Sequence, residues 1–345
     1  MQADTSKTLT FVVPAFNMEL YLGRCVNSLV AARRTDDIEV IIVDDGSSDG
    51  TADLADSLQR RLPGVVRVIH QTNKGHGGAV NAGVAEARGT YIKVVDADDW
   101  VGSDSLERVL KVMRRQVSGP SPVDLLVTDY VYDKVGKHRK HVVRFANVMK
   151  PNRVLGWDDL RHFGIAQYMI MHTLIFRTDV LRESKLELPE HTFYVDFIYS
   201  YQPFPWVKTL MYLDTPLYHY FIGRDGQSVQ TDVMIRRVNQ LRKVNRLMAE
   251  ATPERGTVPQ GLYRYMIHFL SINSVVTSVF LILSRDPKNY QAKAELWKSM
   301  DRMSPQIARD VRRKLPSRAI NLHGPIGRAI IRWGYGVAER FIGFN

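Results

Sequence analysis

The sequence has very little cysteine, and its first residues lack a long apolar segment. Cys25 is the single cysteine among 345 residues, so an internal disulfide and a thiolate metal cage are both excluded. It falls on a predicted amphipathic helix, where we expect a buried structural thiol. Residues 1–10 lack the apolar core of a signal peptide, which predicts that the protein stays in the cytoplasm.

Negative charge is scarce in the last part of the chain. Residues 285–345 hold 13 Lys and Arg against 5 Asp and Glu, a net charge of +8, whereas residues 1–100 hold 10 against 14, a net of −4. An anionic membrane surface, a phosphorylated acceptor or nucleic acid would suit a basic region, and so would an ordinary solvated face. Because no motif of a nucleic-acid module accompanies the charge, we expect no nucleic-acid partner.

Apolar runs and helical patterns alternate in the first third of the chain. Buried strands are predicted at residues 9–16, 40–48, 65–70 and 91–99, and helices at residues 21–32, 51–61, 78–87 and 103–116. This alternation predicts an α/β fold with a mostly parallel central sheet flanked by helices. Ligands of such sheets bind beyond the carboxyl ends of the strands, where polar residues cluster at 14–17, 44–49 and 96–99.

Two changes of pattern divide the chain. The segment SGPSP at residues 118–122 breaks the first half, and from Met234 onward the pattern is helical almost to the end. We therefore predict three parts: residues 1–118, residues 119–232 and a basic helical domain at residues 233–345.

Aspartates follow two of the predicted strands. In an extended segment Asp96 and Asp98 would point the same way across the small Ala97, and their oxygens would suit Mg²⁺ or Mn²⁺. The alternative is an aspartate-rich turn that caps the next helix. At the other strand, Asp44 and Asp45 could bind a base or a ribose, or belong to an ordinary strand-to-helix turn.

The order of four motifs resembles the family 2 glycosyltransferases, which are inverting enzymes with the type A nucleotide-binding fold. The motifs are VVPAFN at residues 12–17, VDDGSSDGT at 43–51, QTNKGHGGAVNAG at 71–83 and VVDADD at 94–99. The resemblance continues more loosely through YVD at residues 194–196 and LYHYFIGRDGQS at 217–228. It covers about residues 9–230 and implies a type A fold with a C-terminal helical domain. Residues 1–118 would then be the nucleotide-sugar-binding half of the catalytic domain, and residues 119–232 the acceptor-binding half with the catalytic base.

The resemblance also implies roles for individual residues. A nucleotide-sugar donor, most simply a UDP-sugar, would be bordered by Pro14, Ala15, Phe16, Asp44, Asp45, Asn73, Lys74, Asp96 and Ala97. Mn²⁺ or Mg²⁺ would be held by Asp98 with Asp96, where it would stabilise the departing diphosphate. Arg224 and Ser228 would close over the diphosphate, although Arg224 could equally be a surface cation.

The resemblance implies that Asp196 is the catalytic base that takes the proton from the acceptor hydroxyl. The family usually has Glu then Asp at this point, whereas this chain has Val195 and Asp196. A helix N-cap is the other role open to Asp196, and Glu190 and His191 are fallback bases. The third motif has Val80 where the family often has Arg, which leaves the donor sugar open.

Together these features predict an inverting, metal-dependent hexosyl- or N-acetylhexosaminyltransferase that acts on a surface glycan, a polymer or a lipid-linked intermediate. The segment QPFPW at residues 202–206 is superficially similar to QxxRW, the signature of processive synthases, but has Pro205 in place of the Arg. This difference favours few additions per acceptor over processive synthesis. The alternatives are a nucleotidyl or sugar-phosphate transferase, and a non-catalytic module that binds nucleotide or glycan.

Two C-terminal segments pose the question of membrane contact. Residues 265–283 contain no Asp, Glu, Lys or Arg, but their polar residues favour a buried core helix over a membrane span. Residues 324–345 combine Ile, Trp and Phe with Arg, which is typical of an interfacial anchor and equally of a helix docked on its neighbours. Peripheral contact with the inner face of the membrane is one expectation.

Overall fold

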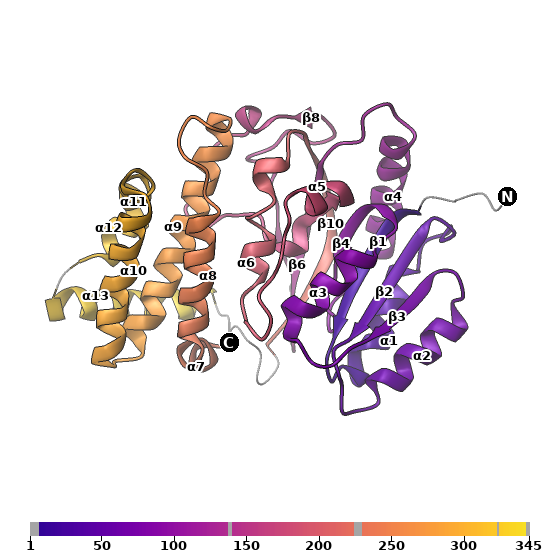
Figure 1. Ribbon diagram of the computed structural model, residues 1–345, viewed down its shortest axis with the longest axis horizontal. Helices are drawn as coiled ribbons and strands as arrows, with labels where there is room; N and C mark the ends of the chain where they lie inside the picture. Colours follow the sequence, from indigo (N-terminus) through magenta and orange to yellow (C-terminus); the bar gives the residue numbers. More distant parts are fainter. Residues whose placement is uncertain (1–6, 137–139, 224–229, 323, 343–345) are drawn as a thin grey trace. The chain divides into compact units, whose positions relative to one another are not determined.

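The chain forms two compact units. The computed structural model describes residues 7–136, 140–223, 230–322 and 324–342 (Figure 1). The first unit comprises residues 1–161 and 169–221, and the second comprises residues 162–168 and 222–345. The first unit carries the sheet, and the second is helical.

Four strands of the first unit form the parallel part of the sheet. They are β1 (Lys7–Ala15), β2 (Ile38–Asp44), β3 (Val66–His70) and β4 (Gly89–Val94), with neighbours in the order β3-β2-β1-β4. Every residue of β2 is buried, as expected for a parallel strand covered on both faces. The predicted strands and their parallel arrangement are confirmed.

The sheet continues beyond β4 with antiparallel strands, which makes it mixed. Strand β9 (Leu174–Arg177) pairs antiparallel with β4 and is followed by β6 (Leu125–Lys134), β10 (Leu210–Ile222) and β5 (Trp100–Val101). Two short strands, β7 (His141–Val143) and β8 (Val154–Leu155), pair with β6 and β10. In this part of the sheet β10 pairs with β5. Strand β5 begins directly after the aspartates that follow β4.

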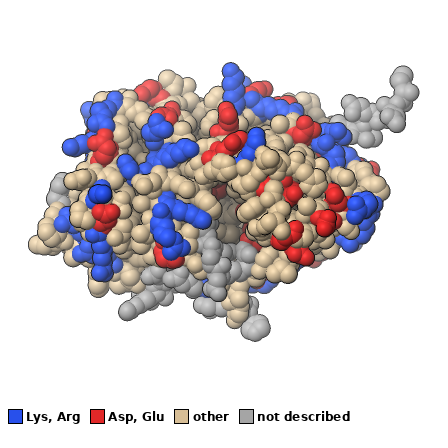
Figure 2. All heavy atoms as spheres, turned by 60° about the horizontal axis from the view of Figure 1, so that its bottom comes forward, with Lys and Arg blue, Asp and Glu red and all other residues tan. Residues whose placement is uncertain are grey.

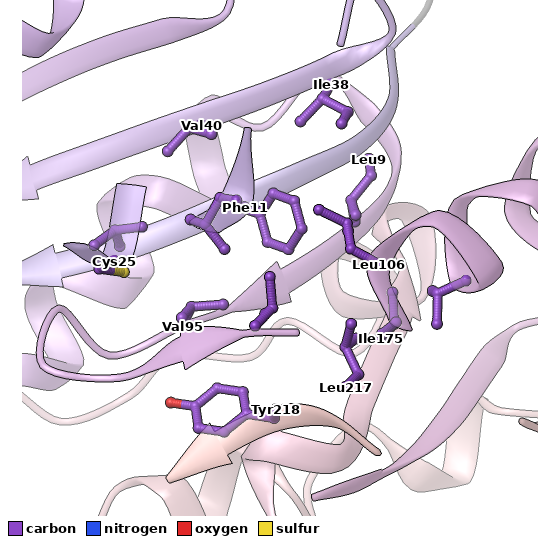
Figure 3. Close-up of a cluster of buried hydrophobic side chains, with 14 of the residues drawn as sticks. Leu9, Phe11, Cys25, Ile38, Val40, Val95, Leu106, Ile175, Leu217 and Tyr218 are labelled. Atoms are coloured by element: carbon purple, nitrogen blue, oxygen red, sulfur yellow. The ribbon is translucent and has the colours of Figure 1, made fainter. Parts of the chain in front are cut away.

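Helices cover both faces of the parallel strands. The face that holds Phe11 and Val40 is covered by α1 (Glu19–Leu29), α2 (Thr51–Arg61) and α4 (Ser103–Val117), as Figure 3 shows for part of this core. Cys25 lies fully buried in the same cluster. On the opposite face, α3 (Gly75–Glu86) packs on β1 so closely that a Cβ at Gly83 would lie 2.2 Å from Val12 Cγ1.

Short elements connect the antiparallel strands. They are the 3₁₀ turns η1 (Trp157–Asp159), η2 (Met171–Thr173) and η3 (Phe204–Trp206) and the helices α5 (Thr178–Glu183) and α6 (Asp196–Tyr199). Two of them carry residues of the candidate site described below: η2 carries His172, and α6 begins at Asp196.

The second unit is a bundle around one long apolar helix. Its helices are α7 (Thr231–Arg236), α8 (Val238–Glu250), α9 (Gln260–Leu283), α10 (Pro287–Met303), α11 (Pro305–Arg312), α12 (Leu315–Ile320) and α13 (Gly324–Ile342). By length and composition α9 could cross a membrane, but 72% of its most apolar stretch is buried inside the structure. Because α8 and α10 to α13 pack around it, α9 serves here as the core helix of the unit.

Candidate functional site

The carboxyl ends of the parallel strands meet at one edge of the sheet. Ala15 at the end of β1 is in register with Asp44 at the end of β2, and Asp44 is in register with His70 at the end of β3. The residues that follow β4 begin with Val95, whose N–H donates to Val12 O at 2.9 Å. The sequence motifs expected to bind the donor therefore lie along this edge.

The loop after β1 borders this edge and is tied to the loop after β2. Pro14 and Ala15 are buried within the sheet, whereas 46% of Phe16 is exposed. Asn17 has a positive φ of 54°, and its Oδ1 accepts a hydrogen bond of 2.8 Å from Ser48 N. The turn at Asn17 thus leaves the Phe16 ring available to a ligand at the sheet edge.

Asp44 and Asp45 are both buried, and each has protein partners. Asp44 Oδ2 accepts from His70 Nδ1 at 3.0 Å, and Asp44 Oδ1 accepts from Ser47 N at 3.2 Å. The hydrogen bonds to Asp44 and to Asp56 raise the pKa of His70 above its ordinary value. His70 therefore lies beside Asp44 at this edge of the sheet, where the sequence predicted only the two aspartates as site residues.

Asp45 anchors the loop that leads into α3. Its Oδ1 accepts hydrogen bonds from Gln71 Nε2 at 2.7 Å and from Lys74 N at 2.8 Å, and its carbonyl accepts from Asn73 Nδ2 at 2.9 Å. Lys74 Nζ lies 3.4 Å from Glu190 Oε1. Asn73 and Lys74 are thus held beside the second motif, as expected, with Asp45 as the residue that positions them.

The segment after β4 is a turn, so the expectation that it is extended is wrong. Asp99 N donates to Asp96 O at 2.9 Å, which reverses the chain through Ala97 and Asp98. This backbone hydrogen bond determines where the side chains of the segment point. The rule that alternate residues of a strand lie on the same face therefore does not apply to Asp96 and Asp98. The turn brings Asp99 close to Asp96, while Asp98 contributes its carbonyl oxygen to Arg24 Nη2 at 2.7 Å.

Asp96 forms an ion pair with a histidine that the sequence reasoning missed. His76 Nε2 in α3 donates to Asp96 Oδ1 at 2.8 Å, and 37% of the His76 side chain is exposed. Burial lowers the pKa of His76, but the hydrogen bond that His76 donates to the Asp96 carboxylate outweighs this effect and leaves the pKa raised. Burial likewise raises the pKa of Asp96, and the His76 bond outweighs this effect, so that pKa is lowered.

Asp99 is enclosed by donors from β10. Its Oδ2 accepts from Tyr218 Oη at 2.5 Å, and its Oδ1 accepts from Phe221 N at 2.7 Å. Burial, and then the neighbouring Asp96 carboxylate, raise the pKa of Asp99 well above its ordinary value. Tyr218 Oη also accepts from Asp96 N at 3.2 Å, so one hydroxyl fixes both ends of the turn.

A group of three side chains at this turn could hold a metal ion. The ligand atoms of Asp96, Asp99 and His172 lie within 4.8 Å of one another. Burial lowers the pKa of His172 to about 4, so its imidazole is neutral at pH 7, and its buried Nδ1 has no hydrogen-bond partner among the residues that the structure describes. An unpartnered buried imidazole nitrogen beside two carboxylates fits a divalent cation, although the oxygens of Asp99 already accept two hydrogen bonds.

Lys93 lies fully buried behind this group. Its Nζ donates to His172 O at 2.7 Å and lies 5.2 Å from the centre of the Tyr218 ring. Burial lowers the pKa of Lys93 to about 7. Lys93 therefore links β4 to η2 through this hydrogen bond. Whenever its ammonium group is charged, its burial lowers the free energy of unfolding.

Replacing Lys93 with Met should remove a pH dependence of stability. Because the folded-state pKa of Lys93 is about 7 and a free lysine titrates near ~10.4, the cost of the buried charge is full below pH ~7 and disappears as the pH rises toward ~10. Urea unfolding at pH 7 and pH 9.5 should show wild-type stability rising relative to Lys93→Met. Lys111→Met, at an exposed site of α4, is the control. An equal difference at both pH values would contradict the prediction.

Asp196 is the first residue of α6, and the N-cap position belongs to Val195. Burial and the Asp96 carboxylate raise the pKa of Asp196, the His76 charge opposes them, and the result is a pKa of about 6. Tyr194, just before it, has a positive φ of 66°. Asp196, Asp96 and His76 are therefore close enough to act on one another's charge, although they come from three separate motifs.

Two expected site residues, Arg224 and Ser228, lie outside the described residues. The fallback bases Glu190 and His191 lie beside Lys74, whose carbonyl accepts from His191 N at 2.9 Å. The residues that sequence reasoning missed are His70, His76, Lys93, His172 and Tyr218. Of these, His76 and Tyr218 carried a signal, because His76 stands inside the third motif, one turn before Val80, and Tyr218 stands inside the looser motif at residues 217–228.

Known proteins resemble this chain in sequence. Residues 10–178 match the family model described as glycosyl transferase family 2. EpsH of Bacillus subtilis (strain 168) is 28% identical over 225 residues, which cover 62% of this chain and 60% of EpsH. The chain thus spans less than two thirds of that relative's length.

Two solved structures share the fold. Residues 1–349 of TarS from S. aureus, in complex with UDP-GlcNAc, are similar with a TM-score of 0.67 at 18% identity, over 94% of this chain and 92% of that one. The mannosyltransferase PcManGT from Pyrobaculum calidifontis, in complex with GDP-Man and Mn²⁺, has a TM-score of 0.54 at 15% identity. The similarity covers 94% of this chain and 86% of that one. The family match places residues 10–178 in glycosyl transferase family 2, and the shared architecture shows that the chain has the type A fold.

Proposed function

We propose that this protein transfers a sugar from a nucleoside diphosphate donor, most simply a UDP-sugar, to an acceptor hydroxyl with inversion at the anomeric carbon. The observation that carries the proposal is the proximity of Asp96, His76 and Asp196 at the carboxyl edge of the sheet. Two carboxylates, one of them hydrogen-bonded to a histidine, would provide a base for the acceptor and a place for the diphosphate of the donor.

The donor would bind along the sheet edge. Phe16 offers an exposed ring for the base, and the Asp44–His70 pair offers polar groups beside it. His76 lies on the face of α3 that also carries Val80, four residues later, where the family often has Arg, and its raised pKa favours the positively charged imidazolium. In this proposal His76 binds the diphosphate of the donor.

A divalent cation, Mn²⁺ or Mg²⁺, would be held by Asp96 with Asp98 or with the Asp99–His172 group. When bound, it supplies positive charge beside the departing diphosphate. His76 and the N–H groups at the start of α3 would orient the same phosphates. The turn held by Tyr218 keeps Asp96 in place while the donor enters.

Asp196 would accept the proton of the acceptor hydroxyl. As that O–H bond breaks, the acceptor oxygen forms a bond to the anomeric carbon, and the bond from that carbon to the diphosphate oxygen breaks with its electron pair leaving on the nucleoside diphosphate. A pKa of about 6 keeps Asp196 ionised at pH 7 and makes it a stronger base than a free carboxylate. In this proposal residues 1–118 hold the donor, residues 119–232 hold the acceptor and the base, and residues 233–345 form the helical domain.

We also propose that the protein works in the cytoplasm at the inner face of the membrane, on a surface glycan, a polymer or a lipid-linked intermediate. Three large apolar side chains on one face of α13 support this setting: Ile326, Ile330 and Trp333 are 76%, 52% and 73% exposed. Lys and Arg side chains also gather over the helices of the second unit, at the left of Figure 2.

Ligand-induced stabilisation tests the donor assignment. A ligand that binds only the folded state raises the melting temperature. We expect UDP or a UDP-sugar with Mn²⁺ to raise it, EDTA to abolish the increase, and CMP to have no effect. Release of a nucleoside diphosphate on adding acceptor, and not pyrophosphate, would then separate transfer from nucleotidyl transfer. No stabilisation by any nucleotide, with or without metal, would refute the proposal.

A further inference from the structure

The second unit contains a cavity rich in positive charge. It lies between α10 and the segment from α11 to the start of α13, and its volume is about 370 Å³. Four basic side chains line it: Lys293, Lys298, Arg312 and Arg328. Among the lining residues that the structure describes, none is an aspartate or a glutamate.

Aromatic rings hold two of these cations in place. Arg312 lies 4.9 Å from the centre of the Trp297 ring, and Arg328 lies 4.6 Å from the centre of the Tyr290 ring. Stacking of this kind occupies the face of a guanidinium group and leaves its N–H edge for hydrogen bonds. Arg312 uses part of this edge within the protein, because its Nε and Nη2 donate to Asp301 at 3.4 and 2.6 Å and Nη2 also donates to Trp297 O at 3.2 Å. Arg328 therefore offers the more available edge to a ligand. The two arginines are therefore oriented before any ligand arrives.

The charge of the cavity is only partly compensated by the protein. Arg312 Nη2 forms an ion pair with Asp301 Oδ2 at 2.6 Å. Arg328 forms no hydrogen bond or ion pair with the residues that the structure describes, and Lys293 Nζ makes one long contact of 3.4 Å with Asn321 Oδ1. Burial, and then the positive charges of Arg312 and Arg328, lower the pKa of Lys293. Crowded cations of this kind are stabilised when an anion binds among them.

A second cavity shows what is distinctive about the first. It has a volume of about 310 Å³ and lies between α8 and the other side of α10, where it is also lined by arginines, Arg242 and Arg246. Glu295 lines that cavity too, and Arg246 pairs with Glu250 at 3.5 Å. Carboxylates therefore neutralise much of its charge, and the α10–α13 cavity is the better anion site.

We propose that the α10–α13 cavity is a binding site for a phosphate group carried by a ligand of the protein. Guanidinium groups bind phosphate with two parallel hydrogen bonds, and a lysine adds a compact charge, so this set of side chains matches a phosphate ester better than a neutral sugar. The volume accommodates a phosphate with one attached sugar or glycerol. The phosphate can come from a lipid headgroup or from a soluble glycan phosphate. The inference is independent of the transfer reaction.

Binding of inorganic phosphate to the full chain, measured by calorimetry at fixed ionic strength, tests the site. We expect saturable binding that weakens about tenfold in Lys293→Gln and in Arg328→Gln, because each substitution removes a charge-assisted hydrogen bond. Lys288→Gln and Arg318→Gln, which remove exposed cations of α10 and α12 outside the cavity, should bind as the wild type does. Melting temperatures without phosphate establish that each variant is folded.

Vesicles distinguish the two sources of phosphate. If a lipid supplies it, vesicles of phosphatidylglycerol with phosphatidylcholine should bind the wild type, compete with inorganic phosphate and lose about tenfold in affinity for Arg328→Gln, whereas phosphatidylcholine alone should not compete. If a soluble glycan supplies it, inorganic phosphate should bind without competition from either vesicle. The proposal is overturned if neither probe binds, or if Lys288→Gln and Arg318→Gln lose as much affinity as the two cavity variants.

Discussion

Replacing Asp196 with Asn should reduce kcat by about 10³-fold, because the proton of the attacking hydroxyl then has no acceptor in the site. Asn has the same shape and preserves the start of α6, so donor binding, measured by ligand-induced stabilisation, should change little. The rate measured with saturating donor and acceptor separates these two effects.

The pH profile adds a second signature of the same residue. Asp196 has a pKa of about 6, so wild-type kcat/KM should fall as the pH drops through about 6, where the carboxylate becomes protonated. The residual activity of Asp196→Asn should lack this fall. Glu190→Gln is the matched control, because Glu190 is a neighbouring exposed carboxylate that pairs with Lys74. If Glu190→Gln loses the activity and Asp196→Asn keeps it, the assignment of the base is wrong.

Replacing Asp96 with Asn should abolish metal-dependent donor binding and reduce turnover by about 10³-fold. The carboxylate belongs to every metal-ligand set considered and is hydrogen-bonded to His76, so its neutral amide loses both a cation ligand and the charge that supports the imidazolium. Stabilisation by UDP with Mn²⁺ should disappear, and the pKa of His76, followed by NMR, should fall. Unchanged Mn²⁺ dependence in this variant would contradict the role of Asp96.

Two further variants identify the partner of Asp96. Asp98→Asn should weaken Mn²⁺ binding if the pair expected from the sequence holds the ion, and His172→Gln should weaken it if the Asp99–His172 group does. Asp99→Asn is less informative, because it also disturbs the hydrogen bonds from Tyr218 and Phe221. Gln in place of His172 keeps a polar side chain in the buried position while removing the imidazole nitrogen.

The sequence by itself determined the parallel half of the fold and the position of the site along it. Strands such as β2 are buried on both faces and appear as continuous apolar runs, and the polar residues that follow each run mark the carboxyl edge. Local signals of this kind depend on the order of residues alone. For the same reason Cys25 could be placed in the core from the apolar spacing of its helix.

The tertiary structure alone decided which side chains meet at that edge. His172 and Tyr218 come from η2 and β10, far along the chain from Asp96. No local pattern marks His172, and the motif that contains Tyr218 gives no sign that its hydroxyl meets Asp96. The expected pairing of Asp96 with Asp98 assumed an extended chain, whereas one backbone hydrogen bond from Asp99 N to Asp96 O turns the segment and brings Asp99 inward. Long-range pairing of β10 with β5 then supplies the donors that make a buried carboxylate at this turn tolerable.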